Sequence, residues 1–339
     1  MPDVPGADGA GAADPSDHGE DEARLNGPWW WACEPRRPCE EEREVLVHIL
    51  VTNDDGVRAP GIAALAAEVV QSGHDVLVVA PMVDYSGAGA AVGPVHSREG
   101  VDYQSHVIEG LGDVPTYGID GPPALAVILA CLGSFGPRPD IVMSGINHGV
   151  NVGRSAMHSG TVGAALTGAH FGLRSLAVSI KWGDDPVPWS SPARLATSLI
   201  PVLAAAPPRT TLNLNVPNVE LGELRGVRHG RLGSGGTIRS AIHDTGTGAP
   251  PPVTRPPFPS GTLRLDLTPL GSNLDVGPDT DAGLVTHGFA SLTPLVAVHE
   301  AGDEARTTMV AAMNTLYEVA GVGPGCDMTA EAEDDQATG

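Results

Sequence analysis

Two adjacent aspartates, Asp54 and Asp55, follow an aliphatic, β-branched run from Val45 to Thr52, with only Asn53 between. Adjacent side chains in a strand point to opposite faces, but Gly56 permits a turn that brings both carboxylates to one point. Two carboxylates that close repel each other unless a cation lies between them, and hard divalent ions favour oxygen ligands. The pair therefore indicates a site for Mg²⁺, Mn²⁺ or Ca²⁺. An ordinary turn is the alternative, because Asp and Gly are preferred turn residues.

Two further loops offer oxygen ligands and backbone amides. The loop from Tyr85 to Gly89 follows a second apolar run and combines the hydroxyl of Ser86 with flexible glycine amides, Gly87 among them. Asn147 follows a third apolar run and offers a neutral amide oxygen to a metal. A plain glycine-rich connector is the alternative for the first loop, and turn chemistry is the alternative for the second.

A phosphate site is indicated at the start of an apolar helix. Ser159, Gly160 and Thr161 lie at the start of a helical run that continues from Val162. Free backbone N–H groups and the helix dipole at such a position bind phosphate without a basic residue. A simple N-cap is the alternative, and it is compatible with the same site.

Strands and helices alternate through the middle of the chain. Apolar, β-branched runs predict strands at 45–52, 74–81, 140–144, 175–181 and 210–216. Ala-rich and Leu-rich runs predict helices at 61–71, 122–135, 161–171 and 192–205. This order predicts an α/β fold with a three-layer, doubly wound, mostly parallel sheet of the Rossmann-like kind. Ligands bind such sheets beyond the carboxyl ends of the strands, where the three polar loops are expected.

The two ends and the later part of the chain differ in composition from the central part. Residues 1–44 and 322–339 are predicted to be an acidic disordered leader and tail, and residues 45–321 to form the folded domain. After Pro217 the composition predicts a β-rich arm, whose residues 233–261 are expected to be mobile or ordered by a partner subunit. Apolar residues at helical spacing between Asp303 and Val319 predict a final helix packed on the sheet.

The formal net charge of -22 is concentrated at the ends, with -8 on residues 1–44, -5 on residues 322–339 and -9 on residues 45–321. A duplex nucleic-acid partner is not expected, because no stripe of Lys and Arg is available to neutralise phosphates. The four cysteines form no CxxC pair, which favours a reducing cytoplasm over a disulfide framework. No apolar run is long enough to span a membrane, and the acidic N-terminus does not resemble a signal peptide.

Five ordered stretches resemble the SurE family of metal-dependent 5'/3'-nucleotidases. They are Ile49 to Leu65, Val78 to Gly89, Arg138 to Gly153, His158 to Gly168 and Asp279 to Leu295. Together they extend over about residues 47–300, so the resemblance implies a SurE-like fold for the domain. It also implies removal of phosphate from nucleoside monophosphates, sometimes with broader phosphatase activity.

The resemblance places one divalent metal ion, Mg²⁺ or Mn²⁺, on Asp54, Asp55, Ser86 and Asn147. Substrate phosphate is expected at the same Ser86, Gly87 and Asn147 and at Ser159, Gly160 and Thr161. Asp54 and Asp55 are the expected catalytic residues: the metal they hold lowers the pKa of a bound water and neutralises charge during phosphoryl transfer. An aspartyl-phosphate intermediate is the second mechanism considered.

The chain departs from the family pattern at three places. Asp84 and Tyr85 stand where the family often has a basic residue before the serine, and the stretch from Gly121 to Val127 lacks the usual Thr and Asp. The Pro-Arg-Gly and Tyr-Trp features of the family's later arm are not evident between Gly233 and Gly261. A catalytically weak nucleotide-binding or scaffold protein on the same fold is therefore the alternative function. A homodimer or homotetramer is expected from the long arm, and none of His148, His158 and His170 is assigned a catalytic role.

Overall fold

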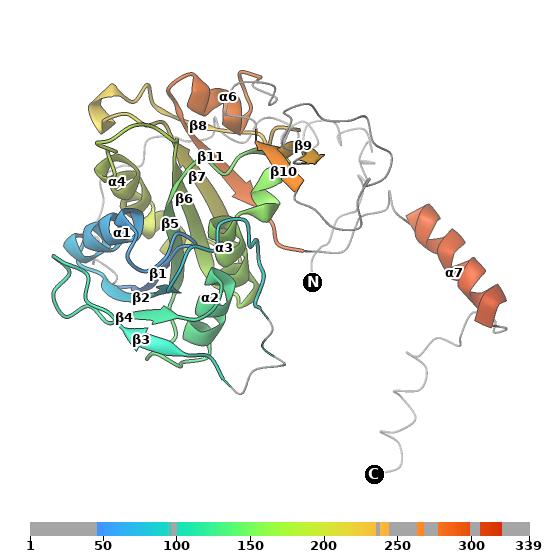
Figure 1. Ribbon diagram of the computed structural model, residues 1–339, viewed down its shortest axis with the longest axis horizontal. Helices are drawn as coiled ribbons and strands as arrows, with labels where there is room; N and C mark the ends of the chain where they lie inside the picture. The colour runs from blue at the N-terminus through green and yellow to red at the C-terminus, as the bar shows by residue number, and fades with distance from the viewer. Residues whose placement is uncertain are drawn as a thin grey trace, which may run out of the picture. The chain divides into compact units, whose positions relative to one another are not determined.

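The computed structural model describes residues 46–93, 95, 100–234, 238–243, 263–267, 277–298 and 306–320. Within this part, the α/β architecture predicted from the sequence is confirmed (Figure 1). The predicted leader and tail lie outside the described residues, so their disorder stays a prediction. None of the described helices has the length and apolar character that crossing a bilayer requires.

Nine strands form one mixed, mostly parallel sheet with the order β3-β4-β2-β1-β5-β6-β7-β11-β8, and two more form a separate antiparallel pair. Only the pairs β3–β4 and β7–β11 are antiparallel in the large sheet. The strands are β1 (His48–Thr52), β2 (Asp75–Pro81), β3 (Tyr103–Ser105), β4 (Thr116–Ile119), β5 (Ile141–His148), β6 (Arg174–Ile180), β7 (Thr211–Val216), β8 (Val227–His229), β9 (Ile238–His243), β10 (Leu263–Leu267) and β11 (Ala290–Leu295).

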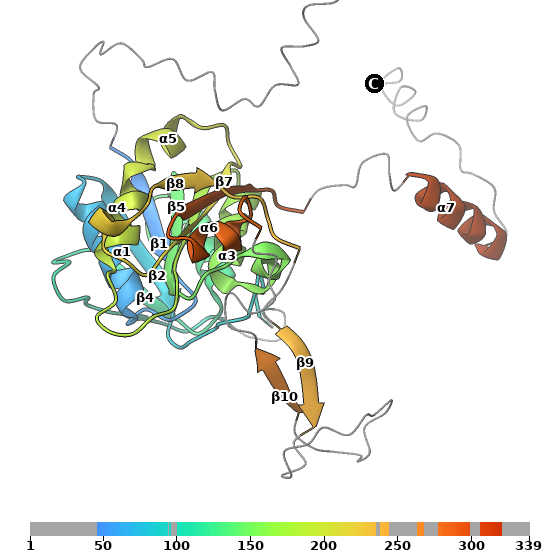
Figure 2. The ribbon, with the colours of Figure 1, turned by 90° about the horizontal axis from the view of Figure 1, so that it is seen from above.

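Helices cover both faces of the large sheet, with α1 and α4 on one side and α3 on the other (Figure 2). The α-helices are α1 (Pro60–Gln71), α2 (Pro123–Cys131), α3 (Gly160–His170), α4 (Ser190–Ser198), α5 (Ile200–Ala205), α6 (Asp281–Thr286) and α7 (Arg306–Ala320). Two 3-10 helices, η4 (Gly153–His158) and η5 (Leu221–Glu223), lie in connecting segments.

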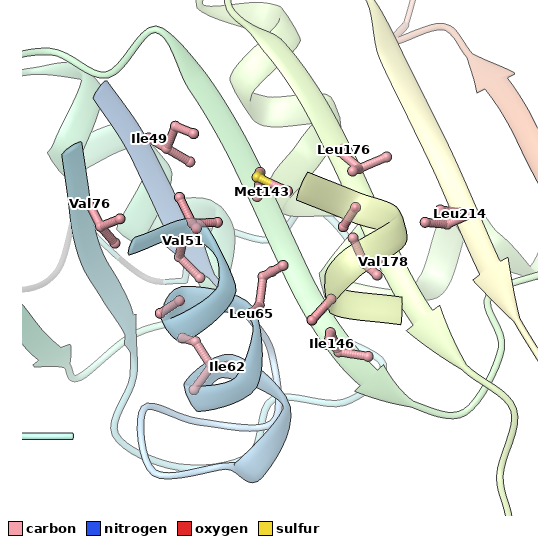
Figure 3. Packing of buried hydrophobic residues seen from close by; sticks show 14 of the residues in the cluster. Ile49, Val51, Ile62, Leu65, Val76, Met143, Ile146, Leu176, Val178 and Leu214 are labelled. Atoms are coloured by element: carbon pink, nitrogen blue, oxygen red, sulfur yellow. The ribbon is translucent and has the colours of Figure 1, made fainter. Parts of the chain in front are cut away.

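The central strands are buried on both faces, which explains their continuous apolar runs. Along β1, Ile49 and Val51 pack with α1, whereas Leu50 between them packs with α2 and α3 on the opposite face. Figure 3 shows the first of these layers, in which Ile62 and Leu65 of α1 pack over the strands. The packing fixes the register of the strands, because a slip of one residue would exchange the two faces.

Two predictions about helices need correction, and one about the arm stays open. The helix expected at 192–205 is two helices, α4 and α5, which meet at Leu199 where Pro201 follows in the first turn of α5. Within the arm 233–261, residues 238–243 form β9, which pairs with β10; most of the remainder lies outside the described residues, so the mobility of the arm stays a prediction. The final helix forms as α7, but its apolar residues Met309, Met313 and Leu316 are exposed rather than buried.

The loop after β2 is held against α3 by a close approach of two backbones. A Cβ atom added at Gly163 of α3 would lie 2.2 Å from the carbonyl oxygen of Gly89 and 2.3 Å from its carbonyl carbon. The backbone N–H of Gly89 also donates to the carbonyl oxygen of His158, at 3.0 Å. A glycine at position 163 therefore determines where the loop carrying Ser86 lies.

We expect Gly163→Ala to lower the free energy of unfolding by about 1 to 3 kcal/mol, because the methyl group meets backbone atoms that have no rotamer to change. Without a clash, alanine would stabilise the helix by up to about 1 kcal/mol relative to glycine. A loss of stability in this variant therefore indicates the clash. Denaturant unfolding measures it. Gly222→Ala is the matched control, because nothing lies within 4 Å of its added Cβ. Equal stability of the two variants would contradict this account of the loop.

Candidate active site

The turn that carries the two aspartates is built by the side chain of Asn53. This residue is fully buried, its amide nitrogen donates to the carbonyl oxygen of Gly56 at 3.0 Å, and its amide oxygen accepts from the Gly56 N–H at 3.2 Å. The next N–H, of Val57, donates to the carbonyl oxygen of Pro81 at the end of β2. The turn is thereby fixed at the carboxyl end of β1, as the strand pattern predicts.

Asp54 is buried against the first turn of α3. The hydroxyl of Thr161 donates to its Oδ1 at 2.5 Å, and the backbone of Thr161 also hydrogen-bonds to the carboxylate. A Cβ atom added at Gly160 would lie 2.6 Å from the Cβ of Asp54, so only glycine leaves room for this carboxylate. The start of a helix carries partial positive charge and unpaired N–H groups, which suits an anionic side chain.

Asp54 and Asp55 lie in an acidic, poorly solvated environment. Burial raises the pKa of Asp55 to about 7, and the neighbouring charges of Asp54 and Asp84 add to the effect. Burial also raises the pKa of Asp54, although the hydrogen bonds from Thr161 oppose the rise. The Oδ2 atom of Asp55 is buried and has no hydrogen-bond partner. Ionisation of both Asp54 and Asp55 is therefore unfavourable unless a cation compensates their charge.

The loop after β2 lies between the aspartates and α3. The N–H of Tyr85 donates to the carbonyl oxygen of Asp54 at 2.7 Å, and the loop's far end is tied to His158 through Gly89. Asp84 accepts the N–H of Ser86 at 2.7 Å, so the acidic residue found in place of the family's basic one shapes this turn. Ser86 and Gly87 are exposed between the two attachments.

A polar network holds the loop after β5. Asn147 was expected after the strand, but β5 continues to His148 and includes it, three residues beyond Ser144, whose neighbour in β1 is Thr52. Its amide nitrogen donates to the carbonyl oxygen of Gly149, in the loop that follows. Its amide oxygen is the atom that suits a cation. The backbone of Asn151 is held by the buried side chains of Asn213 and Asn215 in β7. This loop therefore depends on polar residues of another strand of the same sheet.

The structure brings the predicted site residues to one edge of the sheet but gives two of them structural partners. The hydroxyl of Thr161 is fully buried on Asp54, and the hydroxyl of Ser159 accepts the N–H of Val162 as the N-cap of α3. The N-cap alternative is thus observed for Ser159. Among the histidines, His148 stacks on Trp182, and the backbone of His158 accepts from Gly89.

Sequence reasoning missed two residues that position the site. Asn53 lies in the stretch from Ile49 to Leu65 that resembles the family, but the sequence does not predict its two hydrogen bonds to Gly56. Asp281 is fully buried, and its carboxylate accepts the N–H groups of Gly153, Gly233 and Ala282 at 2.7, 3.1 and 2.9 Å. It thereby joins α6 to the segment that leads into Ser159. The only sequence signal was an acidic residue inside the matched stretch from Asp279 to Leu295.

The site fits a hard divalent cation. No group of three or more His, Cys, Asp or Glu in the described ranges is arranged to hold a metal, and the predicted set instead combines two carboxylates with a hydroxyl and an amide oxygen. Oxygen donors of this kind are the ligands that Mg²⁺ and Mn²⁺ prefer. The unpartnered Oδ2 of Asp55 and the raised pKa of both aspartates fit a cation that neutralises them.

The fold and site define an α/β protein with a two-aspartate site at the carboxyl edge of a mostly parallel sheet. Residues 49–237 match the family model described as survival protein SurE, and the chain belongs to this family. The resemblance stated from the sequence is confirmed.

Named relatives and a solved structure agree with this assignment. The chain is similar to a 5'/3'-nucleotidase SurE of Cronobacter sakazakii, with 36% identity over 76% of this chain and 94% of that protein. It is also similar to a 5'-nucleotidase SurE of Alkalilimnicola ehrlichii, with 37% identity over 74% of this chain and 89% of that protein. The crystal structure of the SurE protein from Aquifex aeolicus matches with a TM-score of 0.61 and 27% identity, covering 78% of this chain and 99% of that one.

We expect Asp55→Asn to stabilise the metal-free protein at pH 8. The unfolded chain ionises Asp55 near pH 3.8 and the folded chain only near pH 7, so ionisation favours the unfolded chain as the pH rises between these values. The gain should be a few degrees in Tm at pH 8 and should disappear near pH 4. Thermal unfolding in EDTA measures it, with Asp113→Asn at an exposed carboxylate as the control. A gain that did not vary with pH would show that charge is not the cause.

Proposed function

We propose that the chain is a phosphoric monoester hydrolase that releases phosphate from nucleoside monophosphates with one bound divalent cation. The observation that carries this proposal is the pair Asp54 and Asp55, confined in a buried turn with an unpartnered carboxylate oxygen. An inert binding protein has no need to hold two carboxylates in such a place. The nucleotidase names of its relatives support the choice of substrate class.

In this proposal Asp54, Asp55, Ser86 and Asn147 hold the cation, which is Mg²⁺ or Mn²⁺. The cation supplies charge neutralisation and activation of the attacking water. The hydroxyl of Thr161 holds the Oδ1 atom of Asp54, and the orientation of the Oδ2 atom is thereby fixed. The exposed backbone of Ser86 and Gly87 receives the substrate phosphate together with the start of α3. Asp55 orients the water, and the low solvation of the pair strengthens each of these electrostatic interactions.

The decisive experiment is phosphate release from a panel of nucleoside monophosphates and p-nitrophenyl phosphate, with Mg²⁺, Mn²⁺ or EDTA. We expect metal-dependent release that falls about 100-fold or more in Asp54→Asn, because a ligand and its charge are lost. Asp113→Asn should retain full activity, since that exposed residue lies outside the site. Equal release from every substrate would indicate a broad phosphatase.

Absence of release with every metal would favour the catalytically weak binding protein instead. Acid-stable phosphate on the protein after rapid quenching would favour an aspartyl-phosphate mechanism over direct attack by water.

We also propose that the protein is a cytoplasmic homodimer or homotetramer. The exposed apolar residues of α7 support self-association: Met309, Val310, Met313 and Leu316 are 53, 48, 39 and 59% exposed. The one cysteine in the described ranges, Cys131, is a buried free thiol, which is compatible with a reducing compartment. Light scattering should give a mass of two or four chains, and Met313→Lys with Leu316→Lys should lower it. A monomeric wild type would exclude the assembly.

A further inference from the structure

A cavity of about 200 Å³ lies between the start of α1 and the segment that follows β3. Its lining residues are Val57, Arg58, Ala59, Ala63, His106, Val107, Ile108 and Glu109. The first three connect the aspartate turn to α1, and Ala63 lies in the first turn of that helix. None of the proposed cation or phosphate residues lines the cavity, so it is separate from the proposed active site.

Much of the cavity lining is aliphatic. Val57 is only 1% exposed and belongs to the buried core cluster that packs α1 on the sheet. Ile108 is partly buried against the same cluster, whereas Val107 is 86% exposed. A ligand with a hydrocarbon part would remove apolar surface of these side chains from water, which favours its binding.

Two opposite charges line the same cavity without neutralising each other. Arg58 and Glu109 are both exposed, and neither has an ion-pair partner among the described residues. They therefore do not form a salt bridge with one another. A ligand that has both charges can use both side chains, because its carboxylate can pair with the guanidinium and its ammonium group with the carboxylate of Glu109.

His106 adds a polar group to the cavity but no charge at neutral pH. Burial lowers the pKa of His106, and the nearby charge of Arg58 adds to the effect, so the imidazole is uncharged at pH 7. Its Nε2 atom lies close to Gly118 of β4, where an added Cβ would be 2.7 Å away. The charged lining residues are then one cation and one anion, which suits a ligand without net charge better than a phosphate ion.

We propose that this cavity binds a small zwitterion with an aliphatic body, which is the chemistry of a free aliphatic α-amino acid. Its carboxylate pairs with Arg58, its ammonium group pairs with Glu109, and its hydrocarbon side chain lies against Val57 and Ile108. A ligand with a single charge leaves one of the two protein charges unpaired. This binding site is additional to the proposed phosphohydrolase function and does not rest on it.

Three ligands of similar shape separate the two charge contacts. L-leucine has both charges, 4-methylpentanoate lacks the ammonium group, and 3-methylbutylamine lacks the carboxylate. Calorimetric titration of each ligand into the full-length protein measures its affinity without turnover. We expect each single-charge ligand to bind about tenfold or more weakly than L-leucine, because one charge-assisted hydrogen bond is lost in each case.

Two substitutions remove the corresponding protein charges. Arg58→Gln and Glu109→Gln should each weaken binding of L-leucine about tenfold or more. In Glu109→Gln the difference in affinity between L-leucine and 4-methylpentanoate should disappear, and in Arg58→Gln the difference between L-leucine and 3-methylbutylamine should disappear. Arg194→Gln and Glu223→Gln remove the same charges from exposed residues outside the cavity, and they should leave all three affinities unchanged.

The outcomes that would overturn the proposal are distinct. Absence of L-leucine binding to the wild type would refute the site, and equal affinity in the wild type and both cavity variants would place the ligand elsewhere. Binding of inorganic phosphate that is lost in Arg58→Gln, without binding of L-leucine, would identify an anion site instead. Because each titration is independent of phosphate release, failure of the proposed phosphohydrolase function would leave these results unaffected.

Discussion

The burial of the Asp54 carboxylate at the start of α3 is the interaction on which the arrangement of the site depends. Asp54 is only 3% exposed as a whole residue, so its carboxylate needs partners, and Thr161 supplies its hydroxyl and backbone. Because Asp54 follows β1 and Thr161 opens α3, the contact joins segments 107 residues apart. The loop with Ser86 lies between them, bonded to Asp54 at one end and to the residue before Ser159 at the other. Displacement of Asp54 would therefore disturb every proposed ligand-bearing segment except the end of β5, which carries Asn147.

Much of the sheet could be predicted because its central strands are buried on both faces. Runs such as Val76 to Ala80 have a single stable location, between two layers of helices, and their order with intervening helices determines a parallel arrangement. The peripheral strands carried no such signal. β3 has three exposed residues, and β8 likewise, so neither shows the hydrophobic pattern of a core strand. These strands are stabilised by the neighbour they pair with rather than by their own composition.

The residue types of the site could be read from the sequence, but their partners could not. An aspartate pair before a glycine indicates a cation site, yet nothing local shows that Thr161 hydrogen-bonds to Asp54 or that Asp281 accepts three backbone N–H groups. Apart from the bond between Asp281 and its neighbour Ala282, those contacts join residues 48, 107 and 128 positions apart. Hydrogen bonds of this range depend on the final packing of the sheet. The final helix shows the same limit: the spacing of Met309 and Met313 predicts a helix, but it does not predict that these residues are exposed.

The burial of negative charge at the aspartate turn links the stability of the fold to the proposed cation. Burial raises the pKa of Asp55 to about 7, and the charges of Asp54 and Asp84 add to the rise, so ionisation of Asp55 destabilises the metal-free fold. A cation held by these carboxylates would remove that cost, because it would compensate both their lost hydration and the repulsion between them.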